Sequence, residues 1–303
     1  MKHTIRYIYI ALAALLQTGC SDTLNTPFAP GEWPIHEAEI AFSVNETEWE
    51  GQTVSMTRSV ETMRELQTSG FGIFCDELSL TNQKVSWDAL TGRWNYGDKM
   101  LWPKNKVNKD IKMFAYAPYD EGIEWKGNSI NAKDSTADWL WGEPSVDDNG
   151  IICMNFQHAL AKLSFGSIIN TYGSTITLKS VEVKELRSAQ STIGNLSLAD
   201  GTWSPVSGET YTYTKNYCET PKTVTEGETT TEETGLEIEN GDAKFLDIAD
   251  ILQIPGVEVT VVFTLETYTD KDIKIEKKVT LERRGVNTEI NLTVGQNHGV
   301  VIQ

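Results

Sequence analysis

The residue with the most distinctive chemical setting is Cys20, in the stretch ALLQTGCSDT. Lys2 and Arg6 precede an apolar run from Tyr7 to Leu16, and small residues lie just before the cysteine. A basic start, a short apolar core and small residues are typical of a secretory signal peptide, and the run is too short to span a bilayer. A thiol directly after the cleavage point resembles a bacterial lipobox, in which cysteine receives diacylglycerol and becomes the new N-terminus. We predict a signal peptide over residues 1–19 and lipidation at Cys20.

One feature departs from the usual lipobox. Gln17 stands where leucine is usual, and Leu16 lies one residue earlier. A plain secretory signal with an incidental cysteine is therefore the alternative. In either case the chain is exported, and residues 21–34, which are rich in Pro, Gly and small polar residues, predict a tether that holds the folded body away from a membrane.

The remaining thiols and imidazoles match no catalytic or metal-binding pattern. Cys75, Cys153 and Cys218 are an odd number, so at most one disulfide forms, and three unpaired thiols are the alternative. No pair of the four histidines has ligand spacing. The chain contains no serine-hydrolase, zinc-protease, P-loop or dinucleotide-binding motif. We predict no enzymatic activity, no metal and no cofactor.

Aromatic and acidic residues suggest two further hypotheses. Nine tryptophans favour a glycan-binding surface, because flat aromatic faces stack on sugar rings, and Trp139 and Trp141 alternate and would share one face of a strand. Packing in the core or at a sheet edge is the stronger interpretation of these two residues. The abundant carboxylates leave a hydrolase as the weakest alternative. Asp147 and Asp148, in VDDNG, favour a solvated turn over a calcium site.

Composition and charge limit the possible partners. The formal net charge is −17 and 39% of the residues are hydrophobic. Such a negative field repels nucleic acid and anionic lipid surfaces, so we predict that neither is a partner. The length that remains after the signal peptide is sufficient for about two domains.

Most of the chain alternates between apolar and polar residues with a period of two. In EIAFSV, Ile40, Phe42 and Val44 lie on one face of a predicted strand. TITLKSVEV alternates with a slip after Leu178, which predicts a bulge. Helical spacing is limited to a turn or two within VETMRELQ, residues 60–67. Short strands separated by polar turns predict antiparallel β-sandwiches.

Two features divide the chain. Each half opens with a strand of similar pattern, near residues 40 and 160, which places a domain boundary near residue 156. Residues 219–241 are dense in Thr and Glu, so we expect a solvated excursion there.

Several stretches, taken in order, resemble the fimbrillin family of Bacteroidales, lipoprotein precursors of type V pili and their accessory subunits. The similarity covers nearly the whole mature chain and is specific in its joint order. It is carried by the lipobox, LQTSGFGIF (residues 66–74), NQKVSWDALTGRWNYGDKMLWP, IKMFAYAPY (residues 111–119), NFQHALAKLSF (residues 155–165) and NTEINLTVGQNHGVVIQ.

The resemblance implies an all-β fold of two tandem transthyretin-like antiparallel β-sandwich domains. It divides the chain into a tether and removable N-terminal strand segment at residues 20–58, a first domain at 59–156, and a second domain at 157–303 with a candidate donor strand. It also implies an outer-membrane, surface-exposed lipoprotein that joins a fimbrium after processing. Host or bacterial surface receptors are possible further partners.

The resemblance implies assembly by strand exchange as well. An arginine-specific protease would cut between Arg58 and Ser59, with Arg64 as the fallback, and would release the strand that carries Ile40, Phe42 and Val44. Another fimbrial subunit would then fill the vacated groove. The candidate donor residues are Ile290, Leu292, Val294, Val300 and Ile302.

Overall fold

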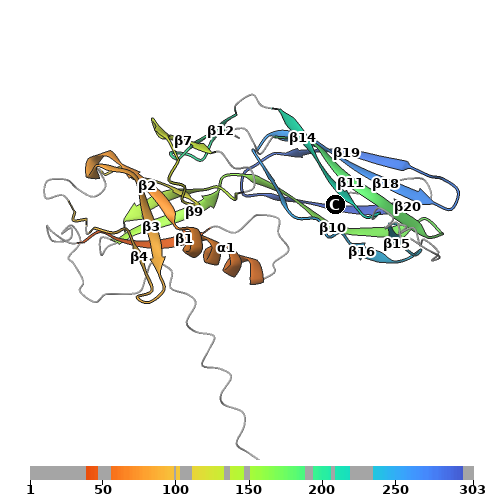
Figure 1. Ribbon diagram of the computed structural model, residues 1–303, viewed down its shortest axis with the longest axis horizontal. Helices are drawn as coiled ribbons and strands as arrows, with labels where there is room; N and C mark the ends of the chain where they lie inside the picture. Colours follow the sequence, from red (N-terminus) through yellow and green to blue (C-terminus); the bar gives the residue numbers. More distant parts are fainter. Residues whose placement is uncertain are drawn as a thin grey trace, which may run out of the picture.

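The computed structural model describes residues 39–46, 56–98, 100–102, 111–132, 137–146, 151–187, 194–205, 209–218 and 235–295. Within these ranges the regular structure is β-strand apart from the helix α1 (Met56–Ser69) and the short 3₁₀ turn η1 (Asp76–Leu78), which confirms the all-β prediction. The strands of the first and second halves gather at opposite ends of the long axis of the molecule (Figure 1).

The first half is built on a seven-stranded sheet of order β1-β9-β8-β5-β2-β3-β4. Its neighbouring strands are antiparallel, except that β1 runs parallel to β9. The strands are β1 (Ala41–Glu46), β2 (Phe71–Cys75), β3 (Leu80–Asp88), β4 (Arg93–Asn95), β5 (Phe114–Ala117), β8 (Leu140–Val146) and β9 (Ile151–His158).

One face of this sheet and α1 enclose the core of the first half. Leu66 of α1 is 2% exposed and packs with Phe71, Met154 and Phe156. The helix ends at Gly70, whose N–H donates to Leu66 O over 2.8 Å and whose φ of +71° favours glycine. The helix has 14 residues, longer than the turn or two that the sequence predicts, because burial of Leu66 stabilises flanking residues that carry no apolar repeat of their own.

The second half consists of two sheets that share one core. One has the order β16-β10-β17 with β20 also beside β10, and the other has the order β14-β11-β18-β19 with β15 also beside β11. The strands are β10 (Ala161–Thr171), β11 (Ile176–Arg187), β14 (Thr210–Asn216), β15 (Leu236–Ile238), β16 (Ala243–Phe245), β17 (Ile251–Gln253), β18 (Val257–Thr267), β19 (Ile273–Leu281) and β20 (Asn287–Gly295).

Two details of the second half bear on the predictions. The register of β11 against β18 shifts between Leu178 and Ser180, which confirms the predicted bulge. β20 runs parallel to β10, so the sheets are not antiparallel throughout. Side chains alternate in the same way in parallel and antiparallel strands, and the pattern therefore does not reveal strand direction.

A fourth sheet joins the two halves. In this junction sheet, β6 (Trp125–Lys126) and β7 (Ser129–Ala132) of the first half pair with β12 (Gly194–Ser197) and β13 (Trp203–Pro205) of the second. Trp203 Nε1 also donates to Ala159 O over 2.6 Å. The domain boundary expected from the sequence, between residues 156 and 157, falls inside β9 (Ile151–His158). The boundary stays a prediction.

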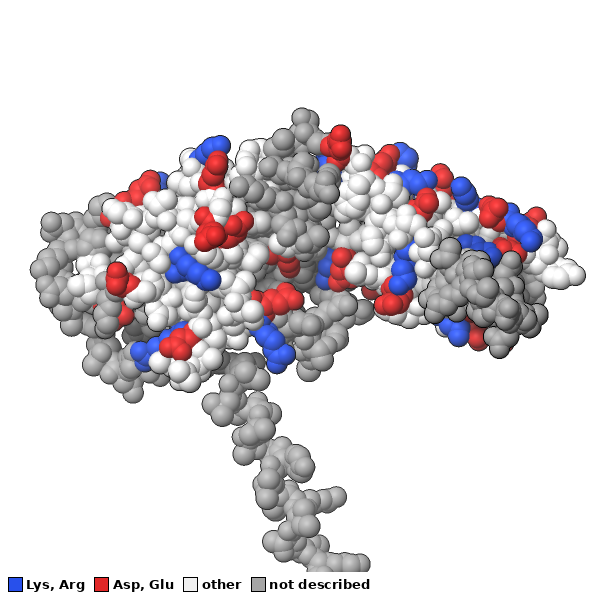
Figure 2. All heavy atoms as spheres, viewed as in Figure 1, with Lys and Arg blue, Asp and Glu red and all other residues white. Residues whose placement is uncertain are grey.

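The charged side chains are dispersed over the surface. Lys and Arg alternate with Asp and Glu over the described parts of the face in Figure 2, without a continuous basic area.

Candidate functional site

The strand β1 of the first half has neighbours along both of its edges. On one side it pairs with β9, with Ala41 opposite Ile151 and Phe42 opposite Ile152. On the other side Glu39 bridges Leu101, and Ile40 N–H donates to Met100 O over 2.9 Å. We call this position, bounded by β9 on one side and by Tyr96, Met100 and Leu101 on the other, the β1 site.

The inner face of β1 is apolar. Ile40 is 1% exposed and Phe42 is 7% exposed, while Val44 is half-buried against the same core. The Phe42 ring packs edge-on against Phe71 at 6.0 Å and against Tyr96 at 5.5 Å between centroids. Burial of an apolar side chain of this size stabilises a fold by about 1.5–3 kcal/mol, so β1 contributes several kcal/mol through these residues.

The outer face and the backbone of β1 make polar contacts. Ser43 Oγ donates to Cys153 Sγ over 3.2 Å, and Asn45 Nδ2 donates to Asn155 Oδ1 over 3.2 Å. The Tyr96 hydroxyl donates to Ile40 O. A slip of one residue would break these pairs and turn the apolar side chains to the other face, so the register of β1 is well defined.

Replacing Tyr96 with phenylalanine is expected to weaken the β1 site by about 1 kcal/mol, because Ile40 O loses a buried hydrogen bond while the ring keeps its contact with Phe42. Urea unfolding followed by tryptophan fluorescence measures the change. Tyr211→Phe is the matched control, since the Tyr211 hydroxyl has no hydrogen-bond partner among the described residues. Equal unfolding free energies for the two variants would contradict the assignment.

The predicted processing position lies at the start of α1. The backbone places Arg58 and Ser59 in the first turn of the helix, and their side chains lie outside the described residues. The fallback, Arg64, is one to two turns further on, where its carbonyl accepts a hydrogen bond from Thr68 Oγ1 over 2.8 Å. First-turn N–H groups lack intrahelical partners, so the first turn unwinds at a lower cost than the middle of the helix.

The predicted donor residues differ in their surroundings. Ile290, Leu292 and Val294 belong to β20 and are at most 2% exposed in the core of the second half, where β20 pairs with β10. Val300 and Ile302 lie outside the described residues, as does the predicted lipidation position Cys20.

The two tryptophans of the glycan hypothesis are in the core. Trp139 is 2% exposed and Trp141 is 5% exposed, so the idea of an exposed sugar-stacking pair at these positions is wrong and the packing interpretation is right. The junction sheet covers the outer face of β8, and Trp141 meets Gly201 and Arg284 of the second half there.

The described residues offer few groups for chemistry. No disulfide joins Cys75, Cys153 and Cys218, all of which are described. Burial raises the pKa of the Cys75 thiol to about 11, so it is protonated at neutral pH and a poor nucleophile. In the same ranges no group of three or more His, Cys, Asp and Glu side chains is arranged to hold a metal, and no helix is long and apolar enough to cross a membrane.

Sequence reasoning missed three residues of the β1 site. Tyr96, Cys153 and Asn155 contact β1 through hydrogen bonds that link positions 56 and 110 residues apart in the chain. The alternation of apolar residues in the chain carries no signal for such pairings, because it does not identify which strands are neighbours.

Comparison with known proteins identifies the family. A family model described as fimbrillin-like matches residues 44–303, most of the chain. No curated protein matches.

Three solved structures to which the chain is similar come from Bacteroides ovatus. A candidate cell adhesion protein is 14% identical, with a TM-score of 0.44, and the match covers 88% of this chain and 95% of that one. A candidate adhesin is 10% identical, with a TM-score of 0.38 and coverage of 88% and 93%. A fimbrial protein is 12% identical, with a TM-score of 0.36, and this chain covers 54% of its length.

Proposed function

The chain belongs to the fimbrillin-like family, and we propose that it is a fimbrial subunit or adhesin at the cell surface that assembles by protease-triggered strand exchange at the β1 site. Before cleavage, Cys20 carries lipid and holds the precursor at the outer membrane. An arginine-specific protease cuts after Arg58. The strand released is β1, and its replacement comes from another fimbrial subunit.

The position of β1 at one edge of its sheet supports this proposal most directly. Its regular strand partner is β9, and on its other side the described residues pair with it through the Glu39–Leu101 bridge and the hydrogen bond from Ile40 N–H to Met100 O. Residues 47–55 connect it to α1, so a single cut after Arg58, in the first turn of that helix, separates β1 from the rest of the fold. The remaining body keeps six strands of the sheet, and its core still includes Phe71, Met154 and Phe156.

Loss of β1 creates a site that is ready for another strand. The edge of β9 becomes free to pair, and the apolar surface that covered Ile40 and Phe42 faces solvent. Unpaired strand edges beside apolar surface favour pairing with another chain. Such head-to-tail contacts produce filaments, because one surface of a subunit binds a different surface of the next.

The donor is the segment that follows β20. Withdrawing Ile290, Leu292 and Val294 would empty the core of the second half, since all three are at most 2% exposed. Val300 and Ile302, which lie outside the described residues, also have the required alternation. We assign the donor role to these two residues.

Limited trypsin digestion of the precursor tests the proposal. We expect the first cut after Arg58, followed by oligomers in size-exclusion chromatography and filaments in electron microscopy. Arg58→Gln is expected to abolish the first cut and the assembly that follows it, whereas Arg64→Gln is expected to leave both the cut and the assembly unchanged. A first cut elsewhere, or a cut at Arg58 that produces only monomers, would contradict the proposal.

A further inference from the structure

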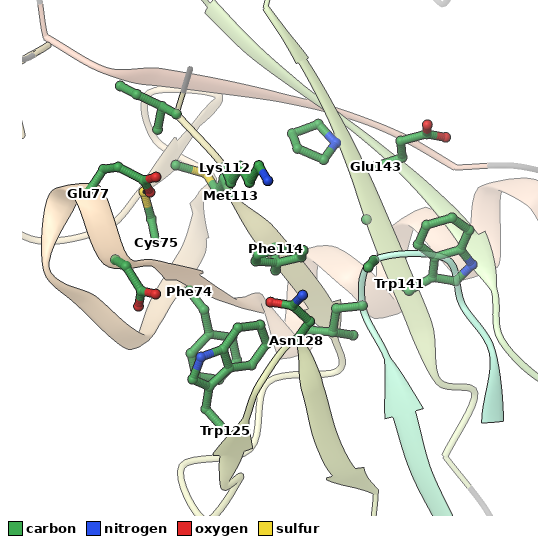
Figure 3. Close-up of a pocket in the computed structure, with 16 residues that line it drawn as sticks. Phe74, Cys75, Glu77, Lys112, Met113, Phe114, Trp125, Asn128, Trp141 and Glu143 are labelled. Carbon is green, nitrogen blue, oxygen red and sulfur yellow. The ribbon is translucent and has the colours of Figure 1, made fainter. Parts of the chain in front are cut away.

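A pocket of about 510 Å³ lies between the first sheet and the junction sheet, away from the β1 site (Figure 3). Phe74, Phe114 and Trp141 of β2, β5 and β8 form its apolar floor. Trp125 of β6 lies against Phe74 and Phe114 and lines the same pocket. Pockets of this volume are typical of small-molecule sites.

Aromatic rings form a rigid wall in this pocket. The rings of Phe74 and Trp125 are stacked, with centroids 4.4 Å apart and planes 12° apart. Phe114 meets Trp125 at 5.2 Å and 46°. Phe74 is buried, but Trp125 and Phe114 are half-buried and keep part of their surface open to the pocket. The wall therefore offers a fixed apolar surface to a ligand.

Asn128 places an amide at the pocket from a well-defined turn. It follows Gly127 between β6 and β7, with φ of +72° at Asn128 and +50° at Gly127. Its carbonyl accepts a hydrogen bond from Leu198 N–H over 2.8 Å, which ties the turn to the second half. Its side-chain amide makes no hydrogen bond to the described residues, so both the donor and the acceptor are available to a ligand.

The charged residues of the pocket select against anions. Asp76, Glu77 and Glu143 supply three carboxylates, and Lys112 supplies one ammonium group. Glu143 is exposed, and its Oε2 accepts a long hydrogen bond of 3.4 Å from Gln157, which leaves Oε1 to bind a ligand hydroxyl. The net negative charge repels acidic ligands.

We propose that this pocket binds a neutral pyranose sugar. The apolar face of the sugar ring packs on Trp125 and Phe114, and its hydroxyls hydrogen-bond with the amide of Asn128 and the carboxylate of Glu143. The pocket shares no residue with the β1 site and needs no cleavage. The inference is therefore independent of the proposed assembly, and its failure would leave that proposal intact.

Saturation-transfer NMR on the uncleaved precursor tests the inference. The probes are N-acetylglucosamine and the methyl glycosides of glucose, galactose and mannose at millimolar concentration, with sialic acid as the acidic comparison. We expect transfer to at least one neutral sugar and none to sialic acid. Absence of transfer to every neutral sugar, or transfer to sialic acid alone, would overturn the inference.

Two variants of pocket residues test whether the sugar binds in this pocket. Asn128→Gly removes the amide and keeps the turn, because glycine adopts positive φ readily, and it is expected to weaken binding about five- to tenfold. Glu143→Gln, at an exposed position, is expected to weaken it about threefold. Asp272→Gly, at a turn residue with φ of +58° far along the second half, is the matched control and is expected to bind like the unmodified protein. Unchanged binding by both pocket variants would overturn the assignment.

Discussion

Replacing Phe42 with alanine is expected to lower the free energy of unfolding by about 3 kcal/mol. The side chain is 7% exposed, and its ring packs edge-on against Phe71 and Tyr96. Removing it leaves a cavity that the two neighbouring rings fill only in part. Urea unfolding followed by tryptophan fluorescence measures the change, because Trp94 and Trp102 lie in the same core.

The control for Phe42 is an exposed aromatic residue that directly follows β18 (Val257–Thr267). Tyr268 is 97% exposed, so Tyr268→Ala is expected to change the unfolding free energy by less than about 0.5 kcal/mol. If the Phe42 variant unfolded at the same urea concentration as the unmodified protein, β1 would not belong to the folded core.

Replacing Gly201 with alanine is expected to destabilise the protein by about 2–4 kcal/mol. Gly201 has φ of +66°, and a methyl group there would lie within 2.5 Å of Trp141 Cε2. The free-energy cost of the backbone strain and the cost of displacing the Trp141 indole add together. Because Gly201 belongs to the second half and Trp141 to β8, the substitution loosens the contact between the two halves at the junction sheet.

A second glycine separates the two effects. Gly92 has nearly the same φ, +64°, and its N–H likewise donates to the carbonyl four residues earlier, but an added methyl group meets nothing within 4 Å. Gly92→Ala is expected to cost about 1 kcal/mol, from backbone strain alone. Thermal unfolding of the two variants provides the comparison, and equal losses would show that Trp141 does not constrain Gly201.

Strand alternation predicted the local structure well. Ile40 and Phe42 lie on the buried face of β1, and the slip after Leu178 is a register shift. Alternation is a local property of a strand, and it reports which side chains are buried. It does not report the neighbouring strand or its direction, so the parallel pairs β1–β9 and β10–β20 and the junction sheet did not follow from it.

Composition was misleading where short strands interrupt polar sequence. The Thr- and Glu-rich region predicted as a solvated excursion ends with β15, in which Ile238 is fully buried against the core of the second half. Residues 219–234 lie outside the described residues. Two alternating apolar residues, Leu236 and Ile238, are enough for a short strand when β11 provides a partner.

The candidate site was predicted only in part. The apolar residues of β1 were identified, since their spacing is local. Their partners Tyr96 and Cys153 were not, because contacts across the sheet depend on the tertiary fold. The sequence also did not indicate that Trp125 and Asn128 line one pocket, although they lie three residues apart. The other walls of that pocket come from β2, β5 and β8, which lie elsewhere in the chain.

The reactivity of Cys153 tests strand exchange most directly. This thiol is 3% exposed beside Ser43 of β1, and Cys75, buried elsewhere in the same half, is the internal control. Iodoacetamide labelling, read by mass spectrometry of the Cys153 peptide, should be slow in the precursor, fast in the cleaved monomer and slow again in the assembled fibre, with Cys75 unreactive throughout. Equal labelling of Cys153 in the precursor and the cleaved monomer would contradict the account, because β1 would then not cover the site that a neighbouring subunit fills.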